Sequence, residues 1–181
     1  MSKLISFGIT SLDGYVADRS GDFQWCMPDD EVHAFVNDFQ RPIHTYLYGR
    51  RLYDVMVYWD TVPADDSISG DFAKQWQAAE KIVYSTTLES VATSRTRLER
   101  LFDPAAVRAL KDSADTDISI GGPELAGEAL RAGLVDEVHQ LISPVIVGGG
   151  NAFLPDIRLD LELLDHRRFG NGVVYVRYRV A

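Results

Sequence analysis

The sequence predicts an α/β fold whose mixed sheet is mostly parallel and is covered by helices on both faces. Two observations predict it. Short apolar runs alternate with amphipathic helical patterns along most of the chain, which is typical of parallel strands joined by helices. The region after Gly133 is rich in β-forming residues and contains Asn171-Gly172, a strong hairpin signal. We therefore expect an antiparallel C-terminal hairpin at the edge of the parallel sheet.

The first elements follow from local patterns. Leu4–Thr10 places Ile5, Phe7 and Ile9 on one side, so we expect a strand that ends before the turn at residues 13–14. Residues 29–39 predict a helix, because apolar residues recur at helical spacing behind an acidic first turn. The next expected elements are a strand at 45–48, a helix at 50–57, a loop at 62–70, a helix at 72–79 and a strand at 81–84.

The second half is read in the same way. Residues 92–100 predict an edge strand, and Asp103 caps a helix that begins with Pro104. A strand at 117–120 leads through a sharp turn at 121–123 into a helix at 124–132, which Gly133 ends. The last expected elements are a β-rich segment at 135–147, with a bulge at Pro144, and hairpin strands at 161–169 and 173–180.

Length, charge and cysteine content exclude several classes of protein. The 181 residues fit one domain, 1–181. Eighteen Lys and Arg against 27 Asp and Glu give a net charge of -9, which argues against nucleic acid or an anionic membrane as a partner. Cys26 is the only cysteine, which excludes an intrachain disulfide and indicates a cytoplasmic protein. The N-terminal apolar stretch is too short and too broken for a signal peptide or a membrane span.

Two junctions between a strand and the next element carry groups suited to phosphate. Gly49, Arg50 and Arg51 open a helix, where free backbone N–H groups and two guanidiniums attract anions; the alternative is a solvated basic turn. Ser85 and Thr86 follow another strand, where their hydroxyls suit a ligand or, equally, cap a turn.

A third junction, Gly121-Gly122, either lets a ligand approach the backbone or forms a plain tight turn. The sequence contains neither GxGxxG nor GxxxxGK[ST], so a dinucleotide would bind by another scheme than these motifs. The four histidines lack metal-ligand spacing, and we expect no metal site.

These junctions, in this order and after an opening strand that ends in residues 11–14 (SLDG), resemble the dihydrofolate reductase-like superfamily. The similarity is greatest to the branch that contains the reductase domain of bacterial riboflavin biosynthesis. It covers Lys3 to Val180 and includes residues 25–31 (WCMPDDE), similar to a segment of its small stand-alone members. The resemblance implies a dihydrofolate reductase-like fold and an NADPH site formed by Gly49, Arg50, Arg51, Ser85, Thr86, Gly121 and Gly122. Leu52 departs from the Thr that folate reductases carry, which removes one hydroxyl contact to phosphate.

The resemblance also implies a carboxylate on the first helix that holds the substrate ring. Asp29, Asp30 and Glu31 begin that helix. At 100° per residue, Asp29 and Glu31 flank the apolar stripe and Asp30 points nearly opposite, which favours Asp29 or Glu31 as the catalytic acid. Capping of the helix is the alternative for Asp29. Asp13 is expected close to the nicotinamide, with a plain turn as the alternative.

Together these features predict an NADPH-dependent reductase of a pteridine, a ribosylaminopyrimidine or a similar small heterocycle. The alternative is a non-catalytic nucleotide-binding or ligand-sensing module with the same fold. The hairpin at 161–180 carries apolar residues on both faces, which predicts a homodimer.

Overall fold

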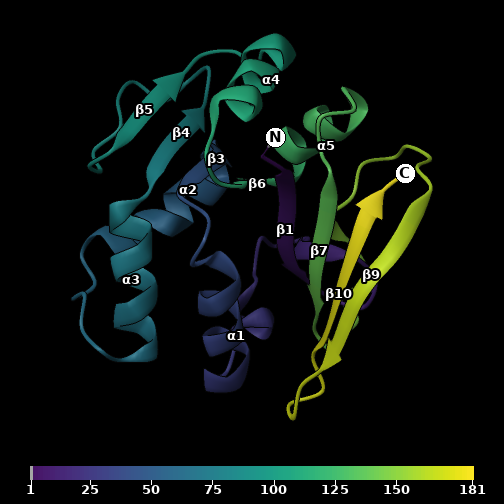
Figure 1. The fold of residues 1–181 in the computed structure, drawn as a ribbon. Helices are drawn as coiled ribbons and strands as arrows, with labels where there is room; N and C mark the ends of the chain where they lie inside the picture. Colours follow the sequence, from purple (N-terminus) through teal and green to yellow (C-terminus); the bar gives the residue numbers. More distant parts are fainter. Residues whose placement is uncertain (1) are drawn as a thin grey trace.

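One large sheet organises the protein, whose computed structural model describes residues 2–181 (Figure 1). Its strands are β1 (Leu4–Thr10), β3 (Thr45–Gly49), β4 (Glu80–Tyr84), β5 (Thr96–Glu99), β6 (Ile118–Gly121), β7 (Glu137–Ile142), β9 (Leu161–Arg168) and β10 (Val174–Val180). They lie in the order β5-β4-β3-β6-β1-β7-β10-β9. The strands from β5 to β7 are parallel, and β10 is antiparallel to both of its neighbours. The mostly parallel sheet with an antiparallel C-terminal hairpin is thus confirmed.

The parallel strands give the sheet two different edges. The turns that follow β1, β3, β4, β6 and β7 all leave from one edge, which we call the carboxyl edge. The same strands begin at the opposite edge, the amino edge. Every site residue expected from the sequence lies at or next to the carboxyl edge, where open α/β sheets bind their ligands.

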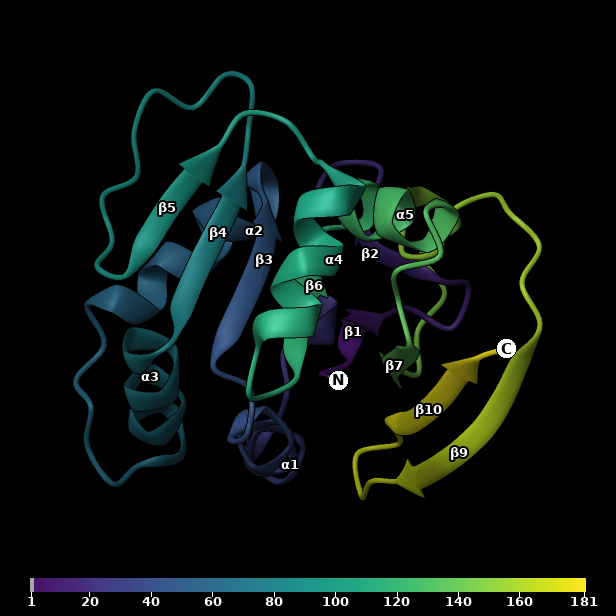
Figure 2. The same cartoon turned by 45° about the horizontal axis from the view of Figure 1, so that its top comes forward.

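Helices cover both faces of the sheet. They are α1 (Asp30–Gln40), α2 (Arg50–Met56), α3 (Ile68–Ala78), α4 (Pro104–Ser113) and α5 (Pro123–Arg131), with short 3-10 helices η1 (Gln24–Cys26) and η2 (Val57–Asp60). The core on one face includes residues of α1, α2 and α3, and the core on the other includes residues of α4 and α5 (Figure 2). Leu47 and Tyr48, neighbours in β3, are buried in opposite cores, as the two-residue period of a strand requires. No helix within the described residues is long and apolar enough to cross a membrane.

Three local features differ from the sequence-based expectation. Helix α3 begins at Ile68, inside the expected loop, because the Ser67 hydroxyl caps it by accepting a hydrogen bond from the Gly70 N–H (2.9 Å). Strand β7 ends at Ile142 and does not extend to residue 147. Strands β2 (Tyr15–Asp18) and β8 (Gly150–Ala152) form a second, small antiparallel sheet that was not expected. Both are too short to show a clear alternation.

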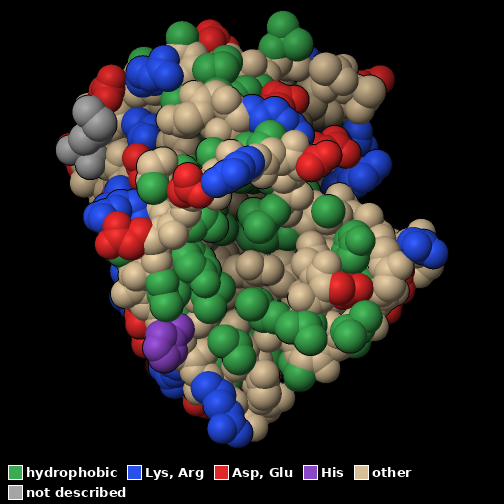
Figure 3. Space-filling model, turned by 90° about the vertical axis from the view of Figure 1, so that its right-hand side faces the viewer, with side chains coloured by type: hydrophobic (Ala, Val, Ile, Leu, Met, Phe, Trp, Pro, Cys, Tyr) green, Lys and Arg blue, Asp and Glu red, His purple; other side chains and the backbone are tan. Residues whose placement is uncertain are grey.

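The C-terminal hairpin is the least covered part of the sheet. All eight residues of β9 are exposed. Viewed from the hairpin side, the molecule shows hydrophobic side chains gathered around a hollow (Figure 3). Large hydrophobic side chains of this region are exposed by 37–50%, namely Leu154, Leu159, Leu161, Leu163, Leu164 and Val174.

Candidate functional site

The turns after β3 and β6 touch each other at the carboxyl edge. Gly122 has φ +92°, and a Cβ built on it would lie 3.2 Å from the backbone nitrogen of Gly49. A side chain at this position is therefore disfavoured both by the left-handed conformation and by the neighbouring backbone. The structure thus brings together two of the three junctions that the sequence singled out.

The third junction is joined to them by Arg50. The Arg50 guanidinium donates a hydrogen bond to the Thr87 hydroxyl (3.2 Å) and another to the Asp54 carboxylate (3.2 Å). Ser85 is buried, and its hydroxyl accepts hydrogen bonds from the Thr87 and Leu88 N–H groups (3.3 and 3.0 Å). The side chain of Thr86 is exposed. These contacts order the hydroxyl-bearing turn, residues 85–88, beside Arg50.

Arg100 is a second guanidinium at this turn and was missed by the sequence reasoning. It follows β5 and donates hydrogen bonds to the backbone carbonyls of Ser85 (3.3 Å), Leu88 and Glu89 (3.3 Å). The sequence alone gives little indication of this contact, because only the pairing of β5 with β4 brings Arg100 to Ser85.

The helices that start at these junctions lack side-chain caps. Gly49 precedes α2 and Gly122 precedes α5, and in neither case does a side chain of the described residues cap the helix. By contrast Asp29, Ser67 and Asp103 cap α1, α3 and α4. Uncapped N–H groups beside guanidiniums and hydroxyls form a donor set that fits the phosphates of a dinucleotide.

Leu52 explains the lack of a side chain at Gly121. A Cβ on Gly121 would lie 2.4 Å from Cδ2 of Leu52. Where folate reductases carry a hydroxyl, this chain therefore has an apolar side chain packed against the glycine pair.

A cavity of about 180 Å³ opens next to the hydroxyl-bearing turn. Its lining includes the Tyr84 ring, the apolar side chains of Leu101 and Leu110, and the carboxylates of Glu99 and Asp103. Arg97 also lines the cavity and donates a hydrogen bond to the Glu99 carboxylate (3.2 Å), while the Asp103 carboxylate caps α4.

Two of the three acids at the start of α1 are engaged by the chain itself. The Asp29 carboxylate accepts a hydrogen bond from the Val32 N–H (3.0 Å) and caps the helix. The Glu31 carboxylate accepts hydrogen bonds from the Arg167 guanidinium (3.2 Å) and the Gly170 N–H (3.0 Å) at the hairpin turn. Both carboxylates would have to give up these contacts to bind a ligand.

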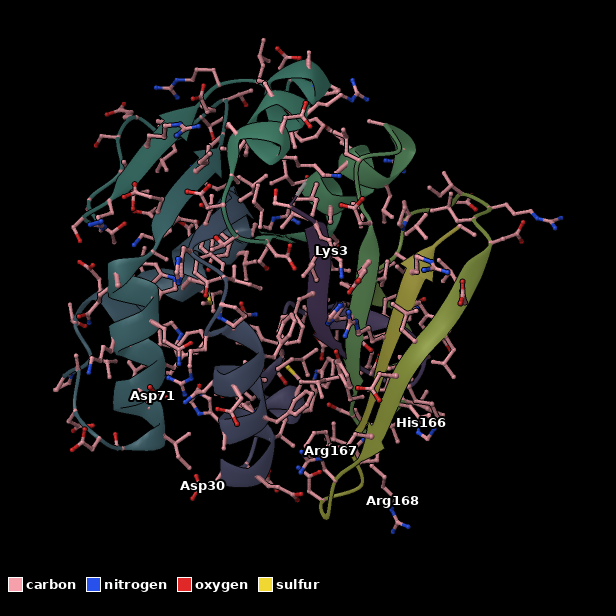
Figure 4. All side chains as sticks on the ribbon, viewed as in Figure 1. Lys3, Asp30, Asp71, His166, Arg167 and Arg168 are labelled. Atoms are coloured by element: carbon pink, nitrogen blue, oxygen red, sulfur yellow. The ribbon has the colours of Figure 1, made fainter. Side chains whose placement is uncertain are left out.

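Asp30 differs from its two neighbours. Its side chain is exposed and makes no hydrogen bond or ion pair with another side chain among residues 2–181. In Figure 4 it points from α1 toward the side of α3, while Arg167 lies between α1 and the hairpin. The apolar stripe of α1 predicts Asp29 or Glu31 as the catalytic acid, and this stays a prediction; the contacts show that both carboxylates are engaged within the chain.

Asp13 anchors a loop at the carboxyl edge. Its carboxylate accepts hydrogen bonds from the Val147 and Gly148 N–H groups (3.1 and 2.8 Å). A hydrogen bond from the Ser11 hydroxyl, together with these N–H groups, lowers the pKa of Asp13 below its ordinary value. The carboxylate is therefore ionised at neutral pH and ties the turn after β1 to the glycine-rich loop before β8.

Comparison with known proteins identifies related sequences. The model of the RibD C-terminal domain family matches residues 2–175. The chain is 28% identical over 172 residues to the protein YyaP of Bacillus subtilis, covering 93% of this chain and 89% of YyaP. It is 30% identical over 161 residues to the riboflavin biosynthesis protein RibD of Mycobacterium tuberculosis. That match covers 82% of this chain and 44% of RibD, so the chain spans less than half of the longer protein.

Solved structures share the fold over almost the whole chain. A Shewanella sp. PV-4 protein assigned to riboflavin biosynthesis matches with a TM-score of 0.77 and 20% identity, covering 99% of both chains. A pyrimidine reductase-like protein from Corynebacterium diphtheriae matches with a TM-score of 0.72 and 18% identity, covering 99% of this chain and 92% of that one. At such identities the likeness establishes the fold.

Proposed function

The chain belongs to the RibD C-terminal domain family, and from this premise we propose that it is an NADPH-dependent reductase of a pteridine, a ribosylaminopyrimidine or a similar flat heterocycle. The observation that carries the proposal is the meeting of three junctions at the carboxyl edge: Gly49 touches Gly122, and Arg50 binds the hydroxyl-bearing turn. Each junction alone is an ordinary turn, but together they offer cationic, hydroxyl and backbone donors to one anionic ligand.

Each part of this edge has a role in the proposal. Arg50 and Arg51, with Ser85 and Thr86, hold the extra phosphate on the adenosine ribose, and Arg100 keeps their turn in shape. Gly121, Gly122 and the uncapped start of α5 receive the pyrophosphate. The cavity beside Tyr84 takes the adenine ring. When bound, the cofactor supplies a hydride from its nicotinamide ring.

The substrate side is proposed from exposed apolar residues on the segments that follow β1 and α2 and precede α1. Leu12 follows β1, Met27 precedes α1 and Tyr58 lies in η2 after α2, and their side chains are exposed by 64%, 61% and 64%. Large exposed apolar side chains beside a ligand site suit the flat face of a heterocycle.

Titration of the three tryptophans with NADPH and NADH tests the proposal. A charge-assisted contact contributes about 1.5–3 kcal/mol, so we expect NADPH to bind roughly tenfold tighter or better. Equal affinities would contradict the assignment of Arg50 and the hydroxyl-bearing turn. A screen of pteridines and aminopyrimidines for loss of NADPH absorbance then separates a reductase from the alternative, a nucleotide-binding module that binds NADPH but oxidises none of it.

We also propose that two copies of the chain associate through the hairpin. The support is the group of exposed apolar side chains on and around β9. Single exposed leucines are common on a protein surface, but several of them in one region indicate an interaction surface. Light scattering at micromolar concentration should show a dimer, and Leu163→Glu should shift it toward monomer. A wild-type protein that stays monomeric would refute the homodimer.

A further inference from the structure

A groove of about 260 Å³ lies between α1 and α3, two helices that pack against each other (Figure 1). None of the residues that line it belongs to the three junctions assigned to the cofactor, and the proposed function makes no use of it. Four of its side chains are carboxylates and one is an ammonium group. The lining consists of Ala34, Asn37 and Asp38 of α1, the loop residues Asp65, Asp66 and Ser67, and Ile68, Asp71 and Lys74 of α3.

Asn37 is the buried residue of this groove, with 3% of its surface exposed. Its Nδ2 group donates hydrogen bonds to the Ile68 carbonyl (2.8 Å) and the Asp71 carboxylate (3.1 Å). Both partners are acceptors, so the amide nitrogen must face them and the orientation of the amide is fixed. No group among residues 2–181 donates a hydrogen bond to its Oδ1 atom. A buried amide oxygen normally has a donor, so this oxygen has capacity for a donor from outside the chain.

Gln75 of α3 shows the same arrangement next to the groove. Its Nε2 group donates to the Asp71 carboxylate (3.2 Å), and its buried Oε1 atom has no donor within the described residues. Arg41 completes the set around Asp71 with two hydrogen bonds (3.1 and 3.0 Å) and holds the pKa of that carboxyl below its usual value. The hydrogen-bonding capacity that remains here therefore belongs to acceptors.

The charges around the groove are not balanced by the chain. Arg41 pairs with Asp38 (3.3 Å) and Asp71 (3.0 Å), and Lys74 is the other cation at the lining. Four carboxylates against these two cations leave two negative charges. Asp65 and Asp66, which lie at the exposed side of the groove, have no cationic partner among residues 2–181. A ligand with two positive charges would complete the balance.

The acceptors suit nitrogen cations better than a metal ion. Within the described part of the chain, no three acidic, histidine or cysteine side chains converge closely enough to hold a metal ion. An alkylammonium group has three N–H donors and no acceptor, which complements an amide oxygen and carboxylates. Ala34 and Ile68 are partly buried and offer apolar surface to methylene groups. The groove is also far larger than the roughly 30 Å³ that one water molecule occupies.

We propose that the groove between α1 and α3 binds a short aliphatic diamine. One ammonium group donates to Oδ1 of Asn37, and the other is held by the exposed carboxylates of Asp65 and Asp66. The methylene chain between them lies against Ala34 and Ile68. Because part of the attraction comes from exposed carboxylates, binding weakens as the ionic strength rises.

Isothermal titration calorimetry with putrescine, a four-carbon diamine, tests the site. We expect saturable binding of one putrescine per chain at low salt, whereas butanediol, an uncharged analogue of the same length, should not bind. Asp66→Lys should weaken putrescine binding about tenfold or more, because it replaces an attractive charge with a repulsive one. Asp112→Lys makes the same change at an exposed acid of α4 outside the groove and should keep the wild-type affinity. Absence of putrescine binding, or equal losses in the two variants, would overturn the inference.

The amide of Asn37 reports where the diamine binds. In isotope-labelled protein, putrescine should shift the assigned side-chain amide signals of Asn37 and leave those of Asn171, at the hairpin turn, unchanged. Unshifted Asn37 signals would overturn the inference even if putrescine bound elsewhere.

A third titration separates a free diamine from the lysine side chain of another protein. The probe is Nα-acetyl-lysine amide, which presents a single ammonium group on a similar chain. We expect it to bind at least about tenfold more weakly than putrescine, because it balances only one of the two charges. Equal or tighter binding would assign the groove to a lysine side chain and contradict the diamine.

Discussion

The amino and carboxyl edges of the sheet differ in how their charged side chains are partnered. At the amino edge, the Glu137 carboxylate is 3% exposed and accepts hydrogen bonds from Arg177 (2.8 and 3.1 Å), while Lys3 lies 2.7 Å away and His139 2.9 Å away. His139 in turn contacts the Tyr175 hydroxyl through its other ring nitrogen (2.7 Å).

A second closed cluster lies at the same edge. The buried ammonium group of Lys111 donates hydrogen bonds to the Leu134 carbonyl and pairs with the Asp136 carboxylate, both at 2.7 Å. Asp136 also accepts a hydrogen bond from the Leu4 N–H (2.6 Å). The charged groups of both clusters are thus paired within the chain.

The carboxyl edge is the reverse. Its glycine turns leave the starts of α2 and α5 uncapped, and the Arg51 side chain is 82% exposed with only a distant carboxylate, Glu124, at 3.8 Å. From this contrast we expect substitution of charges at the amino edge to change stability and, on the proposed function, substitution of charges at the carboxyl edge to change binding. Substitutions at the two edges should therefore separate the two properties.

The largest effect is expected from Glu137→Gln. It leaves Arg177 and Lys3 without their carboxylate, and should lower the free energy of unfolding by about 2–3 kcal/mol, less than for a fully buried pair because both cations are partly exposed. Urea denaturation measures the loss, and NADPH affinity should stay unchanged. A loss of affinity would show that the two edges are coupled.

Acid should act through the same residue. Burial raises the pKa of Glu137, but hydrogen bonds from Arg177, Lys3 and His139 outweigh it and lower the pKa from 4.5 to about 2. The folded-state pKa is depressed, so this contribution to stability is complete above pH 4.5 and is lost as the pH falls toward 2. Unfolding free energies across this window should fall less steeply in Glu137→Gln than in the wild-type protein.

Arg50→Met should produce the largest effect at the carboxyl edge. Loss of a charge-assisted contact should weaken NADPH binding by about tenfold to a hundredfold. Stability should change by less than about 1 kcal/mol, because the ion pair with Asp54 is solvent-exposed. Binding of NADH, which lacks the extra phosphate, is the control and should change much less.

Two glycines with nearly the same backbone conformation sharpen the comparison further. Gly122 has φ +92° and Gly21 has φ +85°, but a Cβ on Gly21 would meet nothing within 4 Å. Gly21→Ala should cost about 1–2 kcal/mol of stability from left-handed strain, and Gly122→Ala should cost more because its Cβ would also meet the Gly49 backbone. Only Gly122→Ala should also weaken NADPH binding. Equal NADPH affinities in the two variants would show that the glycine pair is an ordinary turn and not part of the cofactor site.

The smallest effect is expected at a helix cap. Asp103 accepts a hydrogen bond from the Ala105 N–H (2.9 Å), so Asp103→Ala should lower stability by about 1 kcal/mol. Thermal denaturation measures this loss. Asp103 also lines the cavity beside Tyr84. A larger loss of NADPH affinity in Asp103→Ala than in Asp103→Asn would support the proposed adenine site in this cavity.

Sequence patterns predicted most of the large sheet, whereas the site residues stay a prediction. The alternation of strands and helices, the hairpin at Asn171-Gly172 and the cap at Asp103 are local signals, and the structure confirms all three. Strands β2 and β8 were missed because three or four residues contain too little pattern, and β8 is held by pairing with a distant segment.

The site depended on contacts between distant residues. A helical wheel gives the direction of Glu31 but not the presence of Arg167, which lies far along the chain in β9. In the same way, the packing of Trp59 and Phe72 around His33 depends on how α1 meets η2 and α3. The position of Arg100 likewise required the pairing of β5 with β4.

The place of β1 in the sheet bears on how the chain folds. The first strand to be synthesised lies between β6 and β7, so Leu4 pairs with Ile118 and Ile5 with Glu137. The long loops between these strands must close before contacts between the strands can stabilise the sheet. The entropy lost in this closure slows the folding of parallel sheets. A nascent chain that ends before β6 has no partner for β1, so the sheet closes only after most of the protein has left the ribosome. Truncation from the C-terminal side should therefore abolish folding of the whole sheet once β7 is removed, because the chain holds no smaller unit in which β1 is paired on both sides.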